Sequence, residues 1–145
     1  MKNKVLVLII VGLLVAVGLI VLSKDAIIKQ FARAISRAEG FQIPDSRPAR
    51  NHNPGDLTVD TTGKGIERVP QGFVQYATDA DGWQALERQV SLMFNGSQIY
   101  NSTMTIADVA FRYTTTDQAA WAMIVAQTLG VTISTRLDEL GGKLS

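Results

Sequence analysis

An uninterrupted apolar run near the amino terminus, residues 5–22, sets the first limit on how this chain of 145 residues can fold. Neither a charged residue nor a proline interrupts these eighteen positions. As one helix the run would be about 27 Å long, which is close to the hydrocarbon thickness of a bilayer. No small-residue cleavage pattern follows it, so a retained transmembrane helix is favoured over a cleaved signal peptide.

The basic residues that flank the run indicate how such a helix would be oriented. Lys2 and Lys4 precede it, which favours a cytoplasmic amino terminus, whereas Lys24 on the other side weakens that preference. The sequence therefore predicts a single-pass anchor in a lipid bilayer at residues 1–23. It also predicts one globular domain at residues 24–145, on the outer side of the membrane.

The composition excludes several kinds of site. Without cysteine the chain has no disulfide and no Cys-based metal site, and a single histidine makes a His-built zinc site implausible, so no metal or cofactor is expected. The net charge of +1 argues against a nucleic-acid binder driven by electrostatics. Basic residues nevertheless gather at the start of the domain, either as a solvated face near anionic lipid or as an attraction for anionic partners. They are Lys24, Lys29, Arg33, Arg37, Arg47 and Arg50.

The domain is expected to be mainly helical with one β-like region. Apolar residues recur at spacings of three and four over residues 26–39, which predicts an amphipathic helix that stops at Gly40. Residues 56–76 contain three short β-like segments and a Gly-rich turn, which predict a three-stranded antiparallel sheet. Further helices are expected at residues 79–95, 105–113 and 117–129, with Thr78 as the cap of the first and capping boxes at Thr105–Asp108 and Thr115–Gln118 for the other two. A short last helix or turn is expected at 135–140. The fold class is therefore α+β, mainly α.

Glu39 lies at the end of the first expected helix of the domain. A negative charge there opposes the helix dipole by about 0.3–1 kcal/mol, and the same effect raises the pKa of a carboxyl. A raised pKa is what a general acid needs near neutral pH. The alternative interpretation is a helix residue that simply faces water.

Several short motifs follow one another along the domain. They are Ala-Glu-Gly-Phe at 38–41, Asn-His-Asn-Pro-Gly-Asp-Leu at 51–57, Gly-Phe-Val-Gln-Tyr at 72–76, Gly-Trp-Gln-Ala-Leu at 82–86 and a later segment around Tyr113. This ordered set resembles phage-encoded, virion-associated peptidoglycan-cleaving proteins with a lysozyme-like fold. It is more distantly similar to bacterial wall glucosaminidases and lytic transglycosylases. The resemblance covers residues 30–133 and implies a lysozyme-like domain with a small antiparallel sheet, preceded here by one transmembrane helix.

The resemblance implies roles for five residues. Glu39 would be the catalytic acid, Tyr113 would lie near it, and Asn51, Asn53 and Asp56 would bind substrate. Among the turn residues, Asn53 is the best candidate for a sugar contact. Structural alternatives exist, because Asn and Asp build turns through their side chains and a tyrosine is often a half-buried core residue.

The presence of one well-placed acid favours a particular mechanism. A glycoside hydrolase needs two carboxyl groups. In lytic transglycosylases, which the chain resembles, a single Glu protonates the glycosidic oxygen and then deprotonates the 6-hydroxyl of the sugar, giving a 1,6-anhydro product. Gly40 stands where a Ser commonly follows that Glu, which leaves both a lytic transglycosylase and a muramidase open.

Together these features predict a membrane-anchored enzyme that cleaves the glycan strand of peptidoglycan. Its partners would be that strand, the lipid bilayer and virion membrane or capsid proteins, with no nucleic acid. Its setting would be a virion membrane during phage entry or a bacterial inner membrane facing the periplasm. Two alternatives stay open: a catalytically inactive wall-binding or structural virion membrane protein with the same fold, and a lysis protein released from the membrane.

Overall fold

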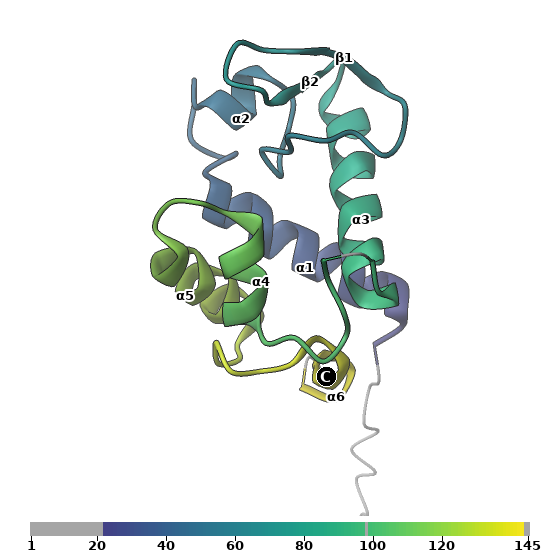
Figure 1. Cartoon of the computed structure of the whole chain (residues 1–145), viewed down its shortest axis with the longest axis vertical. Coiled ribbons are helices and arrows are strands. Elements are labelled where there is room, and N and C mark those ends of the chain that lie inside the picture. Colours follow the sequence, from purple (N-terminus) through teal and green to yellow (C-terminus); the bar gives the residue numbers. More distant parts are fainter. Residues whose placement is uncertain (1–21, 98, 144–145) are drawn as a thin grey trace, which may run out of the picture.

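The computed structural model describes residues 22–97 and 99–143, and Figure 1 shows the arrangement of their helices and strands. The elements in chain order are α1 (Lys24–Glu39), α2 (Arg47–Arg50), β1 (Gly65–Arg68), β2 (Val74–Tyr76), α3 (Asp79–Asn95), α4 (Ile106–Tyr113), α5 (Gln118–Leu129), the 3-10 helix η1 (Leu137–Glu139) and α6 (Leu140–Lys143). The described part is thus mainly helical with one small sheet.

Helix α1 runs through the middle of the molecule, between α3 and α5 (Figure 1). Its apolar stripe is completely buried at Phe31, Ala34 and Ile35. The ring of Phe31 meets that of Phe94, from α3, edge to face at 5.7 Å between centroids. Because two helices cover its apolar stripe, α1 holds its last residue, Glu39, in a fixed place relative to the rest of the fold.

Local signals set both ends of α1. The hydroxyl of Ser23 accepts a hydrogen bond from the backbone N–H of Ala26 and caps the amino end. At the other end Gly40 adopts a left-handed conformation with φ 76°, and its N–H donates to the carbonyl of Arg37. The helix therefore stops directly after Glu39, as the sequence predicts.

The sheet has two antiparallel strands, not the three that were expected. Strands β1 and β2 pair with a bulge between Gly65 and Glu67. The third expected strand, near Leu57, is not formed among the described residues, and side chains bond the backbone of this segment instead. Asn53 accepts from the Leu57 N–H at 2.8 Å, and Asp60 accepts from the Thr62 N–H at 2.9 Å. These bonds turn the segment into a loop, because Asn and Asp side chains compete with strand pairing.

The expected fold class also needs correction at the amino terminus. Within residues 22–97 and 99–143 there is no helix with the length and apolar character to cross a membrane. The expected anchor at residues 1–23 lies outside the described residues, apart from Leu22 and Ser23. Leu22 is half-buried and packs against the core of the domain, so the packed part of the chain begins before the expected boundary at residue 23.

Candidate active site

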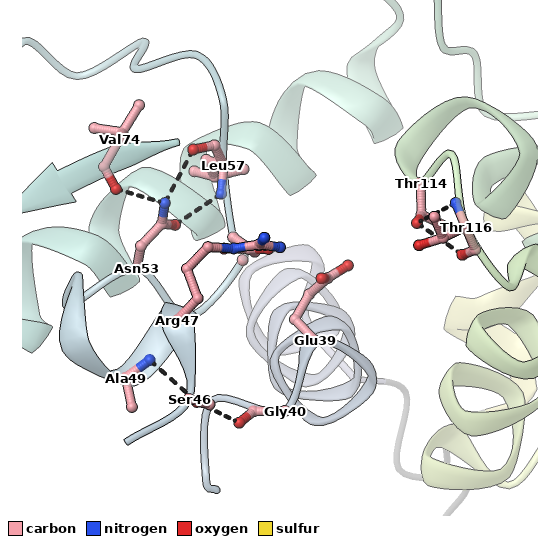
Figure 2. A network of polar contacts seen from close by, with 12 residues as sticks. Glu39, Gly40, Ser46, Arg47, Ala49, Asn53, Leu57, Val74, Thr114 and Thr116 are labelled. Atoms are coloured by element: carbon pink, nitrogen blue, oxygen red, sulfur yellow. Dashed lines mark hydrogen bonds and ion pairs between the residues drawn. The ribbon is translucent and has the colours of Figure 1, made fainter. Parts of the chain in front are cut away.

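Glu39 is half-buried where the end of α1 meets α5. The indole Nε1–H of Trp121, on α5, donates a hydrogen bond to its Oε1 at 2.7 Å. In Figure 2 the carboxylate projects from the helix end, with Arg47 on one side of the view and Thr114 and Thr116 on the other. The acid is thus held by a side chain that lies 82 positions away in sequence.

The surroundings of Glu39 favour its protonated form. Burial raises the pKa of this carboxyl from 4.5 to about 7, because the charged form loses its hydration. The hydrogen bond from Trp121 lowers the pKa, the charge of Asp56 raises it, and that of Arg47 lowers it. The sequence predicts a raised pKa from the position at the helix end, whereas the first cause in the structure is burial.

The raised pKa predicts a specific dependence of stability on pH. Between about pH 4.5 and pH 7 the folded chain holds a proton on Glu39 that the unfolded chain releases, so this residue's contribution to the free energy of unfolding falls as the pH rises. Glu39→Gln lacks that dependence. We expect the variant to be more stable than wild type above pH 7, by at most about 3 kcal/mol.

Paired urea unfolding curves at pH 4 and pH 8 measure this difference. The comparison cancels the contributions of all carboxyl groups that the two proteins share. At pH 4 the two chains should differ little, because Glu39 is then protonated in both the folded and the unfolded state. A constant difference between pH 4 and pH 8 would mean that the carboxyl is not buried as described.

Asn53 holds the polar turn at residues 51–57 together through its buried side chain. Its side chain is fully buried, and both of its amide hydrogens are used, by the carbonyls of Leu57 at 3.0 Å and Val74 at 2.8 Å. Its Oδ1 accepts from the Leu57 N–H (Figure 2). These contacts leave no side-chain N–H of Asn53 for a sugar, so the geometry gives it a structural role instead of the expected substrate contact.

Asp56 is committed to an ion pair with Arg47. Its side chain is only 4% exposed, and it accepts from Arg47 Nε at 3.0 and 3.1 Å and from Nη2 at shorter range. The guanidinium also stacks over the ring of Phe73, 3.6 Å from the centroid. Because the pair neutralises the Asp56 carboxylate and holds it in place, Asp56 is poorly placed to activate water.

Arg47 is brought to the site by a short cap. The hydroxyl of Ser46 donates to the carbonyl of Gly40 at 2.9 Å and accepts from the N–H of Ala49, which caps α2 (Figure 2). Gly40 directly follows the acid in sequence. One serine thus connects the end of α1, which carries Glu39, to the start of α2, which carries Arg47.

Tyr113 connects α4 to the same turn. Its hydroxyl donates to the carbonyl of Gly55 at 2.6 Å, and its ring lies 5.2 Å from that of Trp121, tilted by 32°. Burial raises the pKa of this hydroxyl well above its usual range, so it remains a donor. The structure therefore links Tyr113 to Glu39 through Trp121.

Asn51 lies at the carboxyl end of α2 and is 7% exposed. Its backbone N–H donates to the carbonyl of Arg47 at 3.1 Å, and its own carbonyl accepts from the N–H of Tyr76 at 2.9 Å. The buried Nδ2 has no hydrogen-bond partner among the described residues. Asn51 thus joins α2 to strand β2 and keeps an unused donor.

Two residues of this arrangement were not expected from the sequence. The sequence alone predicts a core position for Trp121 and places Arg47 in a cluster of basic residues. A buried indole needs a partner for its single N–H, which is the one signal that could have drawn attention to Trp121. Nothing local in the sequence pairs Arg47 with Asp56.

A groove of about 430 Å³ lies elsewhere along the same two helices, and it is lined by Arg37, Gln42, Ile124, Gln127 and Thr128. Its lining contains no carboxyl group. Within residues 22–97 and 99–143 no cluster of His, Asp and Glu side chains is arranged to hold a metal ion.

Comparison of the chain with protein-family models, with curated proteins and with solved structures gave no match. The function proposed below therefore rests on the site and on the sequence motifs. In chemical terms, the site offers one carboxyl whose pKa is raised to about 7, held by a hydrogen-bond donor and placed near an ion pair.

Proposed function

We propose that this protein cleaves the glycan strand of peptidoglycan, with Glu39 as the proton donor. One observation carries the proposal: a half-buried carboxyl whose pKa is raised to about 7 and whose Oε1 is held by the indole of Trp121. Such a group keeps its proton at a pH where an ordinary glutamate has lost it. The resemblance of the motifs to peptidoglycan-cleaving proteins indicates peptidoglycan as the substrate class.

The reaction class we propose is lytic transglycosylation. Glu39 gives its proton to the glycosidic oxygen as the bond from that oxygen to C1 breaks. The resulting carboxylate then takes the proton of the sugar's own 6-hydroxyl, whose oxygen bonds to C1 and closes a 1,6-anhydro ring. No water is consumed, and Glu39 ends protonated, as it began.

The ion pair of Asp56 favours this class over hydrolysis. An inverting hydrolase needs a second carboxylate free to activate water, and a retaining one needs a second carboxylate free to attack the sugar. Asp56 is the acid whose charge acts on Glu39, yet Arg47 holds both of its oxygens. A single carboxyl that serves first as acid and then as base fits this arrangement better.

The products of digestion separate the two classes. We expect muropeptides released from purified peptidoglycan to end in 1,6-anhydro sugars. Mass spectrometry detects them, because each lacks the elements of one water relative to a hydrolysed end. Only reducing ends among the products would show that water is the acceptor and would require a second acid, with Asp56 the first to examine.

A further inference from the structure

A continuous set of contacts leads from the polar turn to the acid. The carbonyl of Gly55 accepts from the hydroxyl of Tyr113, the ring of Tyr113 packs on that of Trp121, and the indole of Trp121 donates to Glu39. The four residues come from the turn, α4, α5 and α1. The position of the carboxyl is therefore set by three helices and a loop together.

We propose that Trp121 is a positioning residue for the general acid: its indole N–H holds Oε1 of Glu39 as an acceptor and so assigns the transferable proton to Oε2. This inference rests on the proposed function of Glu39. It concerns which oxygen of the carboxyl delivers the proton, and so from which side of the carboxyl the glycosidic oxygen must be reached.

The chemistry of the indole decides which oxygen of Glu39 carries the proton. The Nε1–H group is a donor only and cannot accept a proton from the acid. In a protonated carboxyl the carbonyl oxygen is the better acceptor, so the oxygen that faces Trp121 at 2.7 Å is the one without the proton. The hydroxyl then lies on Oε2, on the other side of the group.

The surroundings of Trp121 keep it in this orientation. The residue is 5% exposed, so a rotation of the indole would leave a buried N–H without a partner. Helix α5 also packs along α1, and the ring of Tyr113 covers one side of the indole. The charged and titratable groups that act on Glu39 are Arg47, Asp56 and Tyr113, and none of them donates a hydrogen bond to Oε1 within the described part of the chain.

The same hydrogen bond serves both halves of the proposed reaction. Donation to the carboxylate favours the charged form and so opposes the effect of burial on the pKa of Glu39. A group that must first give a proton and then take one back works best when its pKa is close to the working pH. Trp121 thus opposes the rise in the pKa of Glu39 that burial causes.

Indole N–H signals in two-dimensional NMR test the contact without relying on activity. The chain has two tryptophans, so two indole signals are expected. In wild type the signal of Trp121 should shift with pH and with a midpoint near 7, and in Glu39→Gln it should not shift over that range. Trp83, on α3, packs against Phe41 and provides the internal reference. A Trp121 signal that stays constant from pH 5 to pH 9 in wild type would overturn the proposal.

Trp121→Phe tests the role in catalysis, with Trp83→Phe as the matched control. Phenylalanine keeps an aromatic ring but has no N–H. In a plot of cleavage rate against pH, we expect the fall in rate on the high-pH side to move to higher pH by about one unit. The maximal rate should fall about three- to tenfold. Trp83→Phe should leave the pH of this fall in rate unchanged. If Trp121→Phe lowers the melting temperature but does not change the pH at which the cleavage rate falls, the role of the tryptophan is merely structural.

These outcomes separate the two proposals. A titrating Trp121 signal in a protein that cleaves no peptidoglycan would refute the proposed function and, with it, the positioning role, while confirming the hydrogen bond. A constant signal in a protein that does cleave would refute only the role of Trp121.

Discussion

Glu39→Gln is expected to lower the rate of peptidoglycan cleavage by about 10²–10⁴-fold, the usual contribution of a general acid. Glutamine keeps the shape of the side chain and still accepts the hydrogen bond from Trp121, but it has no proton to deliver. The loss should therefore come without loss of folding. Release of dye from labelled peptidoglycan measures the rate, and circular dichroism reports the fold.

Glu67→Gln is the matched control for this experiment. Glu67 lies exposed on strand β1, so the substitution removes the same charge from the surface. Its activity should stay close to that of wild type. If Glu39→Gln keeps more than about a tenth of the activity, the acid lies elsewhere, with Asp45 and Asp56 the next residues to test.

Gly82→Ala is expected to destabilise the domain by about 3 kcal/mol, or about 10 °C in melting temperature. A methyl group at Gly82 would lie 1.9 Å from the carbonyl oxygen of His52 and 2.8 Å from Cδ of Pro54. The nearer contact is with backbone, which cannot rotate away. The first turn of α3 would have to move off the polar turn that carries Asn53 and Asp56.

Gly141→Ala is the control for that prediction. The added methyl at residue 141 would meet only the end of the Ile27 side chain, at 3.4 Å, which is an ordinary contact. Alanine also favours a helix over glycine, so little loss of stability is expected in α6. Equal melting temperatures for Gly82→Ala and wild type would mean that α3 does not pack on the turn as described.

Helices with strong local signals were predictable from the sequence. The expected helix at residues 79–95 matches α3, because Thr78 caps it and apolar residues recur on one face. Thr105 and Asp108 form the expected capping box of α4. In both cases the side chains that start the helix lie within three residues of the bonds they make, so the neighbouring sequence is sufficient.

The start of α5 shows where that reasoning fails. A capping box between Thr115 and Gln118 was expected, but the Gln118 side chain donates to the carbonyl of Thr114 at 2.9 Å. Asp117 takes the capping position with φ 48° and makes no capping hydrogen bond through its side chain. The spacing of a motif allows a cap, while the backbone conformation of the preceding loop decides whether it forms.

The candidate site was predictable only in part. Glu39 stood out through its place at the end of a helix, and the turn through its Asn, Pro and Gly residues. The direction in which Asn53 points, and the partners of Glu39 and Asp56, depend on how distant segments pack. Trp121 reaches Glu39 because α5 packs along α1, and no periodicity within either helix encodes that contact.

The most direct test of the account is to detect soluble muropeptides released from purified peptidoglycan by the full chain near pH 6, with Glu39→Gln run in parallel. Wild type should release them, and the variant should release almost none. Equal release by both proteins would remove Glu39 from the chemistry. No release by a folded wild-type protein that still binds the polymer would instead support a wall-binding protein without enzymatic activity and would contradict the proposed function.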